Sequence, residues 1–245
     1  MKGFKGKLSI LVPAHNEGPH IYGNIREIQR VFNEIGCQYE LIIIDDGSTD
    51  ETYGNIQKAA KGFSNIIVKK IRRNQGKGRA LKYGFRFAKG DLVAFLDADL
   101  DLHPEQIQYL FKIMNKDRAD VVIGSKRHPE SKLDYPRQRK FISHIYFLVI
   151  KSLFSLPIKD TQTGLKLFKY EVLKKVFPKV LVKRYAFDLE LLVNIHHLGY
   201  KIVEAPITLN YQRIMGRIRL KDLYHTGMDT LAIFYRMHIL RHYDR

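Results

Sequence analysis

Short apolar runs alternate with amphipathic segments through the first half of this 245-residue chain, and this alternation limits the folds open to it. Each run has the length of a strand and is nearly all apolar, while the segments between carry apolar residues at helical spacing. We expect five strands in this half, at residues 8–12, 39–44, 66–71, 92–96 and 120–124. Apolar strands that alternate with helices are typical of an α/β fold, in which helices cover both faces of a mostly parallel sheet.

Beyond residue 124 the chain changes in character, because a basic stretch at 125–140 reads as a loop and a strongly apolar segment follows it. The pattern predicts further helices at 141–158, 185–199 and 220–245, and short strands at 201–203 and 207–211. The predicted organisation is one catalytic domain, 1–215, followed by an amphipathic helical tail, 216–245. Within the domain we expect a nucleotide-binding half at about 1–124 and an acceptor half at about 125–215, with an interface helix at about 139–157.

Bulk composition indicates an anionic partner and an intracellular setting. The formal net charge is +17 and the isoelectric point about 9.8, which suits a phosphorylated substrate, an anionic lipid or a nucleic acid. The single cysteine, Cys37, excludes an internal disulfide. The first residues lack the apolar core of a secretory signal, and no apolar run reaches the length of about 18–20 residues that spans a bilayer. We therefore expect a chain that does not cross a membrane alone.

Three carboxylates follow the fourth apolar run at alternate positions, at Asp97, Asp99 and Asp101. In an open α/β sheet, ligands bind where strands leave the carboxyl edge. Acids this close raise one another's pKa unless a cation lies between them, and hard divalent ions bridge carboxylates to phosphates. The pattern predicts that these three aspartates bind Mg²⁺ or Mn²⁺; a solvated acidic turn is the alternative.

Seven short motifs, in order along nearly the whole chain, identify a family. They are Val12–Glu17, Ile44–Asp50, Asn74–Gly78, Asp97–Asp99, Gly124–Lys126, Asp160–Phe168 and Glu204–Ile207. With these motifs the chain resembles the inverting nucleotide-diphospho-sugar glycosyltransferases of GT-A fold, and among them the polyprenyl-phosphate hexosyltransferases of the dolichyl-phosphate mannosyltransferase type. The resemblance implies a GT-A fold, a Rossmann-like sheet with helices on both faces, together with amphipathic interface helices.

The resemblance also implies a donor site. Relatives contact the nucleotide base and ribose from the first strand, here through Pro13, His15 and Glu17, although the family usually has Tyr in place of His15. Further residues matching donor-binding positions are Asp46 near the base, Lys77 in a Gly-flanked loop, Asp97, Asp99 and Asp101 on the metal and diphosphate, and Arg213 in a loop that closes over the diphosphate.

A phosphate acceptor is already ionised at neutral pH, so it requires positioning by cations rather than a strong general base. We assign this role to Lys126, Arg127, Arg139 and Ser143, which lie just past the fifth strand. The resemblance places Asp160 near the sugar or metal. The residues predicted to act in catalysis are thus Asp99, Asp160, Arg139 and Arg213. For an alcohol acceptor, Asp160 or Glu190 would be the candidate base.

The leading functional prediction is transfer of a hexose, with inversion, to a polyprenyl or dolichyl phosphate, using mannose from GDP-mannose. The same reaction with a UDP-sugar, giving a glucosyl or N-acetylhexosaminyl lipid phosphate, stays open. So does transfer to a saccharide hydroxyl, which the basic stretch followed by an apolar segment disfavours. A nucleic-acid-binding module would leave Asp97 and Asp99 unexplained and lacks a recognised motif.

A lipid acceptor requires contact with a membrane. The apolar segment 141–158, flanked by basic residues, suits a helix lying in the membrane interface, while covering the core or a dimer seam is the alternative. The tail 220–242 repeats the pattern, and for it both interpretations stay open. We expect a protein peripheral to the cytoplasmic face of the membrane, with a membrane-anchoring partner subunit as one means of attachment.

Overall fold

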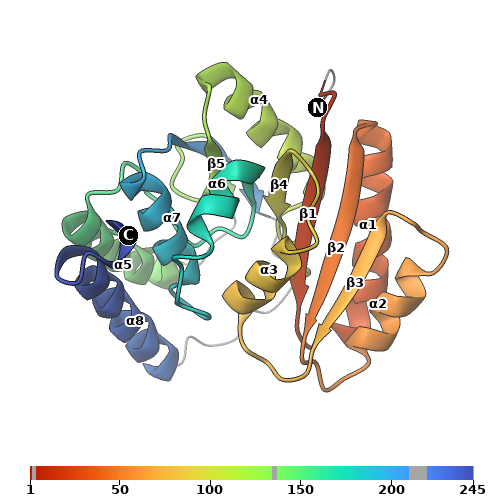
Figure 1. Cartoon of the computed structure of the whole chain (residues 1–245), viewed down its shortest axis with the longest axis horizontal. Helices are drawn as coiled ribbons and strands as arrows, with labels where there is room; N and C mark the ends of the chain where they lie inside the picture. The colour runs from red at the N-terminus through yellow and green to blue at the C-terminus, as the bar shows by residue number, and fades with distance from the viewer. Residues whose placement is uncertain (2–3, 134–136, 210–219, 245) are drawn as a thin grey trace.

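One large sheet organises the molecule, which we describe from a computed structural model covering residues 1, 4–133, 137–209 and 220–244 (Figure 1). In the two helices that begin at 137 and 220, side chains are described from 146 and 224 onward. In sheet order, the strands are β3 (Ile66–Ile71), β2 (Gln38–Asp46), β1 (Lys7–Ala14), β4 (Leu92–Phe95), β7 (Lys166–Lys169), β5 (Val121–Ser125) and β8 (Ile202–Pro206). Every pairing is parallel except those of β7, which runs antiparallel to both β4 and β5. A second, two-stranded sheet pairs β6 (Lys132–Leu133) with β9 (Thr208–Leu209).

Helices cover both faces of the sheet, as the apolar strands require. One face packs against α1 (Gly18–Ile35), α2 (Thr52–Ala60) and α4 (Ile107–Asp117), which η1 (Pro104–Gln106) precedes. The other face packs against α3 (Lys77–Phe85), α5 (Arg137–Phe154), α6 (Tyr170–Val176), α7 (Phe187–His197) and α8 (Leu220–His238), with η2 (His242–Asp244) after it. Neighbouring residues of β1 pack on opposite faces of the sheet. Leu11 lies in the core on the side of α3, whereas Ile10 and Val12 lie in the core on the side of α1. This alternation follows from the two-residue period of a strand.

The predicted α/β class and all five early strands are confirmed: β3 has the predicted bounds, and the ends of the other four strands differ by at most two residues. Three features differ from the expectation. The segment 125–140, expected to be a loop, contains β6 and the first turn of α5. The helix expected at 185–199 is shorter, since α7 spans Phe187–His197. Helix α6 and the antiparallel direction of β7 were not predicted, because strand direction depends on pairing across the sheet rather than on local sequence.

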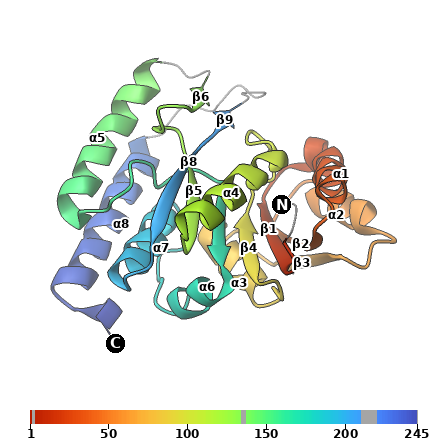
Figure 2. The same ribbon diagram turned by 90° about the horizontal axis from the view of Figure 1, so that it is seen from above.

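Helices α5 and α8 lie side by side at one end of the sheet (Figures 1 and 2). The Tyr146 hydroxyl and Thr230 Oγ1 are 3.4 Å apart, and the rings of Phe154 and Phe234 meet edge to face. Ile233 of α8 is buried in the same core as the central strands. The helical tail therefore packs on the catalytic domain, while the predicted domain division itself stays a prediction. Among the described residues, no helix is long and apolar enough to cross a membrane.

Candidate active site

A cleft opens at the carboxyl edge of the sheet, where β1, β2 and β4 end together. Its volume is about 200 Å³, and its lining includes most of the predicted donor-site residues: Pro13, His15, Glu17, Asp46, Lys77, Asp97 and Asp99. They meet because parallel strands deliver the residues after their carboxyl ends to one edge. The loops after β1 and β2 are also tied together, since Asn16 N–H donates to Ser48 and Glu17 N–H donates to Thr52. The sequence prediction thus located the cleft, while the role of each residue stays a prediction.

Lys77 and Asp97 form an ion pair inside this cleft, with Nζ 2.6 Å from Oδ1. Burial alone would raise the pKa of Asp97, but attraction to Lys77, and then to Lys166 and Lys126, holds it below its ordinary value. Burial likewise disfavours the charged form of Lys77, yet Asp97 raises the lysine's pKa overall. Gly164 makes room for this pair, because a Cβ there would lie 1.7 Å from an Asp97 carboxylate oxygen. Both groups are therefore charged at neutral pH.

Asp99, only two residues away, differs from Asp97 in that its surroundings raise its pKa instead of lowering it. Burial, followed by repulsion from Asp97 and Asp101, raises the pKa of its carboxyl to about 6. A carboxylate held among other acids gains most from a cation beside it. Asp101, half-buried in the same turn, donates its backbone N–H to Asp99 Oδ1 at 3.2 Å.

Metal binding by Asp97, Asp99 and Asp101 stays a prediction. Among the described residues, no group of three or more His, Cys, Asp or Glu side chains is arranged around a common ion position. The Asp97 carboxylate pairs with Lys77. These side chains suit a metal ion that binds together with a phosphate-bearing substrate, because Mg²⁺ commonly binds one or two carboxylates plus substrate phosphates. Asp99 is the ligand that this arrangement offers.

Asp46 lies at the cleft, and its carboxylate organises the Gly-rich loop. Its two oxygens accept the backbone N–H groups of Gln75, at 3.0 Å, and Gly76, at 2.7 Å. Gly76 adopts φ +98°, a left-handed conformation that favours glycine. A contact between Asp46 and the nucleotide base stays a prediction, but the carboxylate already fixes the loop that carries Lys77.

The predicted acceptor residues Lys126 and Arg127 line a small hollow of about 40 Å³ beside α5. Tyr146, Phe147 and Ile150 form its apolar wall, and the Arg127 guanidinium lies over the Phe147 ring at 5.0 Å from the centroid. Cations therefore meet apolar side chains at this point. Arg139 and Ser143 lie in the first turns of α5, but their side chains are outside the described residues, as is the whole of Arg213.

Asp160 is buried next to Lys126, and hydrogen bonds engage both of its oxygens. One accepts the N–H of Lys126 at 2.9 Å and the hydroxyl of Thr163 at 2.7 Å, and the other accepts the N–H of Gln162 at 3.0 Å. Burial would raise the pKa of Asp160, but Lys126 and these donors lower it. The geometry fits the predicted orienting role, because Asp160 fixes the backbone that carries Lys126.

Glu190, the other candidate base, does not reach the cleft. It is fully buried in α7, where its oxygens bind backbone N–H groups and the Tyr243 hydroxyl. Sequence reasoning placed it near a helix start but could not indicate which way the helix would face.

A buried lysine on β7 escaped the sequence prediction. Lys166 is fully buried, pairs with Asp188 at 2.6 Å and also donates to the Thr163 carbonyl. Burial lowers its pKa, which Asp188 partly offsets. A lysine between leucines in Leu165–Phe168 was a usable signal, because a strand buried on both faces rarely accepts a charge without a partner.

The comparisons with known proteins agree with this geometry. Residues 9–177 match the sequence profile described as Glycosyl transferase family 2. A dolichyl-phosphate beta-glucosyltransferase of Trichomonas vaginalis is 31% identical, over 97% of this chain and 76% of the relative. Another, of Dictyostelium discoideum, is 33% identical over 85% of this chain and 67% of the relative. The chain therefore belongs to glycosyltransferase family 2, and it is a hexosyltransferase.

Solved structures confirm the GT-A fold. Glucosyl-3-phosphoglycerate synthase from Mycobacterium tuberculosis, solved with Mn²⁺, UDP-glucose and glycerol 3-phosphate, superposes with a TM-score of 0.69 and 20% identity, over 94% of this chain and 79% of that one. Mannosyl-3-phosphoglycerate synthase from Rubrobacter xylanophilus gives 0.71 and 18%, over 96% and 75%. At these identities the likeness concerns the fold alone.

Proposed function

We propose that this protein transfers a glucosyl unit, with inversion, from UDP-glucose to a polyprenyl phosphate such as dolichyl phosphate. The observation that carries the proposal is the juxtaposition of an acid-lined cleft at Asp97 and Asp99 with cations at Lys126 and Arg127 beside an apolar wall. Relatives named as dolichyl-phosphate glucosyltransferases support glucose over the mannose first expected, so UDP-glucose, the alternative donor, replaces GDP-mannose.

The described side chains fit an in-line displacement. An acceptor phosphate oxygen attacks the anomeric carbon while the bond from that carbon to the diphosphate breaks, and UDP leaves with the electron pair. A divalent cation, Mg²⁺ or Mn²⁺ and held by Asp99, would neutralise the charge that develops on the diphosphate. Lys77 lies across the cleft, where its ammonium can contact the same group. A single displacement inverts the configuration of the sugar.

Transfer to a saccharide hydroxyl is less well supported, because it requires a general base. The two acids considered for that role, Asp160 and Glu190, already accept hydrogen bonds from backbone N–H groups of nearby loops. A phosphate acceptor needs only orientation, which Lys126 and Arg127 could provide together with Arg139 and Ser143.

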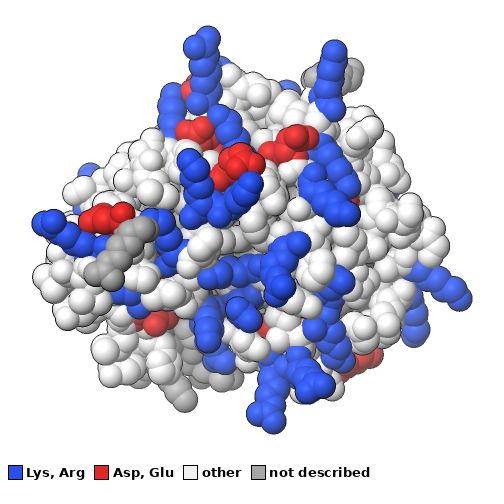
Figure 3. Space-filling model, viewed as in Figure 1, with Lys and Arg blue, Asp and Glu red and all other residues white. Residues whose placement is uncertain are grey.

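A polyprenyl acceptor implies a membrane-facing surface, and α5 and α8 provide the best match. Their outer sides expose an apolar stripe consisting of Leu148, Val149, Tyr224, Met228, Leu231, Tyr235 and Ile239. Lys and Arg also predominate over Asp and Glu across much of the surface seen in Figure 3, which favours anionic headgroups. We propose that this stripe contacts lipid and keeps the protein peripheral on the cytoplasmic face; a membrane-anchoring partner subunit is a second means of attachment.

The test is a paired donor assay. Purified protein is incubated with dolichyl phosphate, Mn²⁺ or Mg²⁺, and either radiolabelled UDP-glucose or GDP-mannose, and the organic phase is counted. We expect label from UDP-glucose only, and none without metal or with Asp99→Asn. Label from GDP-mannose alone would restore the first expectation, and label only in a water-soluble saccharide would contradict a lipid phosphate acceptor.

A further inference from the structure

Glu190 of α7 links the loop just before its helix to the C-terminal helix and turn, which come much later in the chain. Oε2 accepts the N–H groups of Leu181, at 2.8 Å, and Val182, at 2.6 Å. Oε1 accepts the Tyr243 hydroxyl at 2.5 Å and pairs with Arg236 of α8 at 3.0 Å. The carboxylate thus fixes the backbone of residues 180–185, which we call the strap, against the C-terminal helix and turn.

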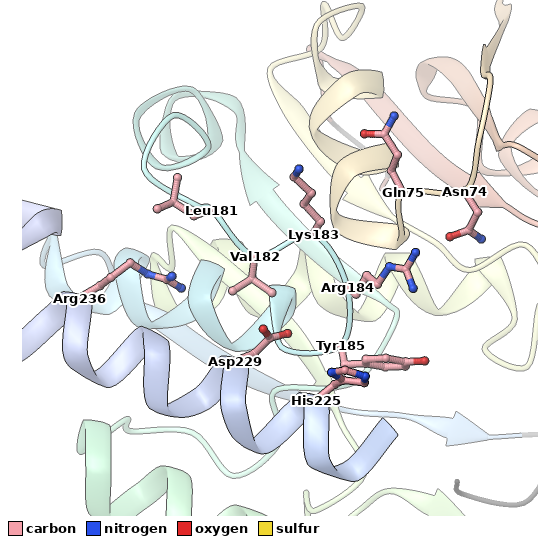
Figure 4. Close-up of a pocket in the computed structure, with 10 residues that line it drawn as sticks. All are labelled: Asn74, Gln75, Leu181, Val182, Lys183, Arg184, Tyr185, His225, Asp229 and Arg236. Carbon is pink, nitrogen blue, oxygen red and sulfur yellow. The ribbon is translucent and has the colours of Figure 1, made fainter. Parts of the chain in front are cut away.

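Two lysine hydrogen bonds hold the start of the strap. Lys82 of α3 donates to the Val180 carbonyl at 2.6 Å, and Lys179 donates to the Tyr243 carbonyl at 2.6 Å. A pocket of about 740 Å³ separates α8 from the Gly-rich loop, with the strap along one side (Figure 4). In this view Arg236 points from α8 toward Leu181 and Val182.

The strap in turn supports the donor loop. The Lys183 carbonyl accepts the N–H of Gly78, at 3.0 Å, in the first turn of α3. The fit is close, because a Cβ on Gly76 would lie 2.6 Å from the Lys183 oxygen and 2.5 Å from Arg184 Cγ. Lys77 lies between these two glycines and faces Asp97. Movement of the strap must therefore move the residue that faces the diphosphate position.

We propose that Glu190 is a positioning residue for the donor cleft: it holds the strap so that the Lys183 carbonyl sets Lys77 opposite Asp97. Through the hydrogen bond from Tyr243 to Glu190, the C-terminal turn thereby helps to support the donor cleft, which lies on the other side of the strap. That the cleft binds UDP rests on the proposed function, whereas the claim that Glu190 positions Lys77 does not.

Glu190→Gln tests this with little change in volume. A Gln amide nitrogen cannot accept, so in either orientation one set of donors loses its partner. Hydrogen exchange at residues 74–82 should become about tenfold faster, as expected when a local opening is eased. The Kd for UDP with Mn²⁺ should rise by a similar factor, about tenfold, while the KM for dolichyl phosphate stays unchanged.

Glu40→Gln is the matched control. Glu40 is also buried, and it accepts from Lys7 Nζ at 2.5 Å, Ser9 at 2.6 Å and the Lys89 N–H at 2.6 Å, at the opposite edge of the sheet. This variant should lower Tm without changing exchange at 74–82 or UDP binding. Tyr243→Phe, which removes one donor to Glu190, should give about a threefold change in the same direction as Glu190→Gln.

Unchanged exchange at 74–82 in Glu190→Gln, with a loss of Tm like that of Glu40→Gln, would reduce Glu190 to a fold-stabilising role and overturn the proposal. A fall in kcat with exchange and UDP binding unchanged would also overturn it, in favour of a general base. If Glu190→Gln does not fold, Tyr243→Phe decides by the same exchange measurement. If the wild type does not bind UDP, exchange still tests the positioning claim, and the donor assignment alone fails.

Discussion

The donor side and the acceptor side of the cleft are built differently. On the donor side, the acids in the cleft lie within a few positions of the end of β1, β2 or β4, and the sheet aligns those ends; Lys77 comes from the start of α3, after β3. On the acceptor side, Lys126 follows β5, but its surroundings come from α5 and from the loop before β7. A sheet edge gathers donor residues through strand order alone, whereas the acceptor side depends on how helices and loops pack.

The two sides also differ in how their acids are used. Asp97 and Asp99 line the cleft, whereas Asp160, on the acceptor side, accepts the backbone N–H groups of Lys126 and Gln162. The comparison therefore predicts that changes at the donor acids abolish chemistry, and that changes on the acceptor side alter substrate binding.

The largest effect should come from Asp99→Asn, which keeps the shape but removes the charge that holds a cation. We expect transfer to fall by about 10³-fold, the order found for loss of one group that stabilises developing charge. Asp91→Asn, at the opposite end of the same strand, should leave transfer nearly unchanged. Initial rates with saturating UDP-glucose measure both, and circular dichroism checks the fold. Equal activity in Asp99→Asn and Asp91→Asn would contradict a special role for the carboxyl edge of the sheet in catalysis.

Gly164→Ala should produce the next largest effect. The new Cβ would overlap the Asp97 carboxylate and displace it from Lys77, and a misplacement of that size can cost about 10²-fold in rate. Gly54→Ala is the control, since nothing lies within 4 Å of a Cβ at that position of α2. We expect that control to gain about 0.5–1 kcal/mol in unfolding free energy. Comparable rates in the two variants would show that the Asp97 position is not critical.

The pH dependence of metal binding provides a third test. The folded pKa of Asp99, about 6, lies above the ordinary 3.8, so the protonated form favours folding below about pH 4 and this stabilisation is lost as pH rises through 6. A metal needs the ionised form, so affinity for Mn²⁺ with UDP should fall about tenfold for each pH unit below 6. Calorimetric titrations from pH 5 to 7.5 measure this. Affinity that does not change across that range would exclude Asp99 as the titrating ligand.

On the acceptor side, Lys126→Ala and Arg139→Ala should each raise the KM for dolichyl phosphate about tenfold, the loss expected for one charge-assisted phosphate contact. The KM for UDP-glucose should change much less. Lys61→Ala, at the exposed end of α2, is the control. An equal rise in both KM values would contradict the assignment of Lys126 and Arg139 to the acceptor rather than to the donor.

The smallest signal concerns the apolar stripe on α5 and α8 that we propose to contact lipid. The chain contains no tryptophan, so Leu231→Trp introduces a single fluorophore on α8, and Tyr109→Trp places one on α4 as a control with similar exposure. With vesicles containing anionic phosphatidylserine, the emission of the tryptophan on α8 should shift to the blue by about 5–10 nm and be quenched by brominated lipid, as expected for a residue at the acyl boundary. A shift that depends on protein concentration without vesicles would point to self-association at this face.

Local sequence was sufficient for the donor side. The apolar runs fixed the strands, and the residues directly after them, Asp46, Asp97 and Asp99, had to reach the carboxyl edge once the sheet was parallel. Lys77 was also predictable, because the Gly-flanked loop opens a helix at the same edge. The reason is physical: burial on both faces leaves a parallel strand little freedom in where its end lies.

Only the tertiary structure decided what each acid contacts. It turned Asp97 toward Lys77, buried Glu190 under the strap and inserted Lys166 into β7 beside Asp188. These contacts join residues 8 or 9 positions apart, as for Glu190 with the strap, 22 apart for Lys166 with Asp188, and 53 apart for Glu190 with Tyr243. Periodicity reports which face of an element is apolar, but the partner of a buried charge depends on which elements pack together, and that is settled only when the chain has folded.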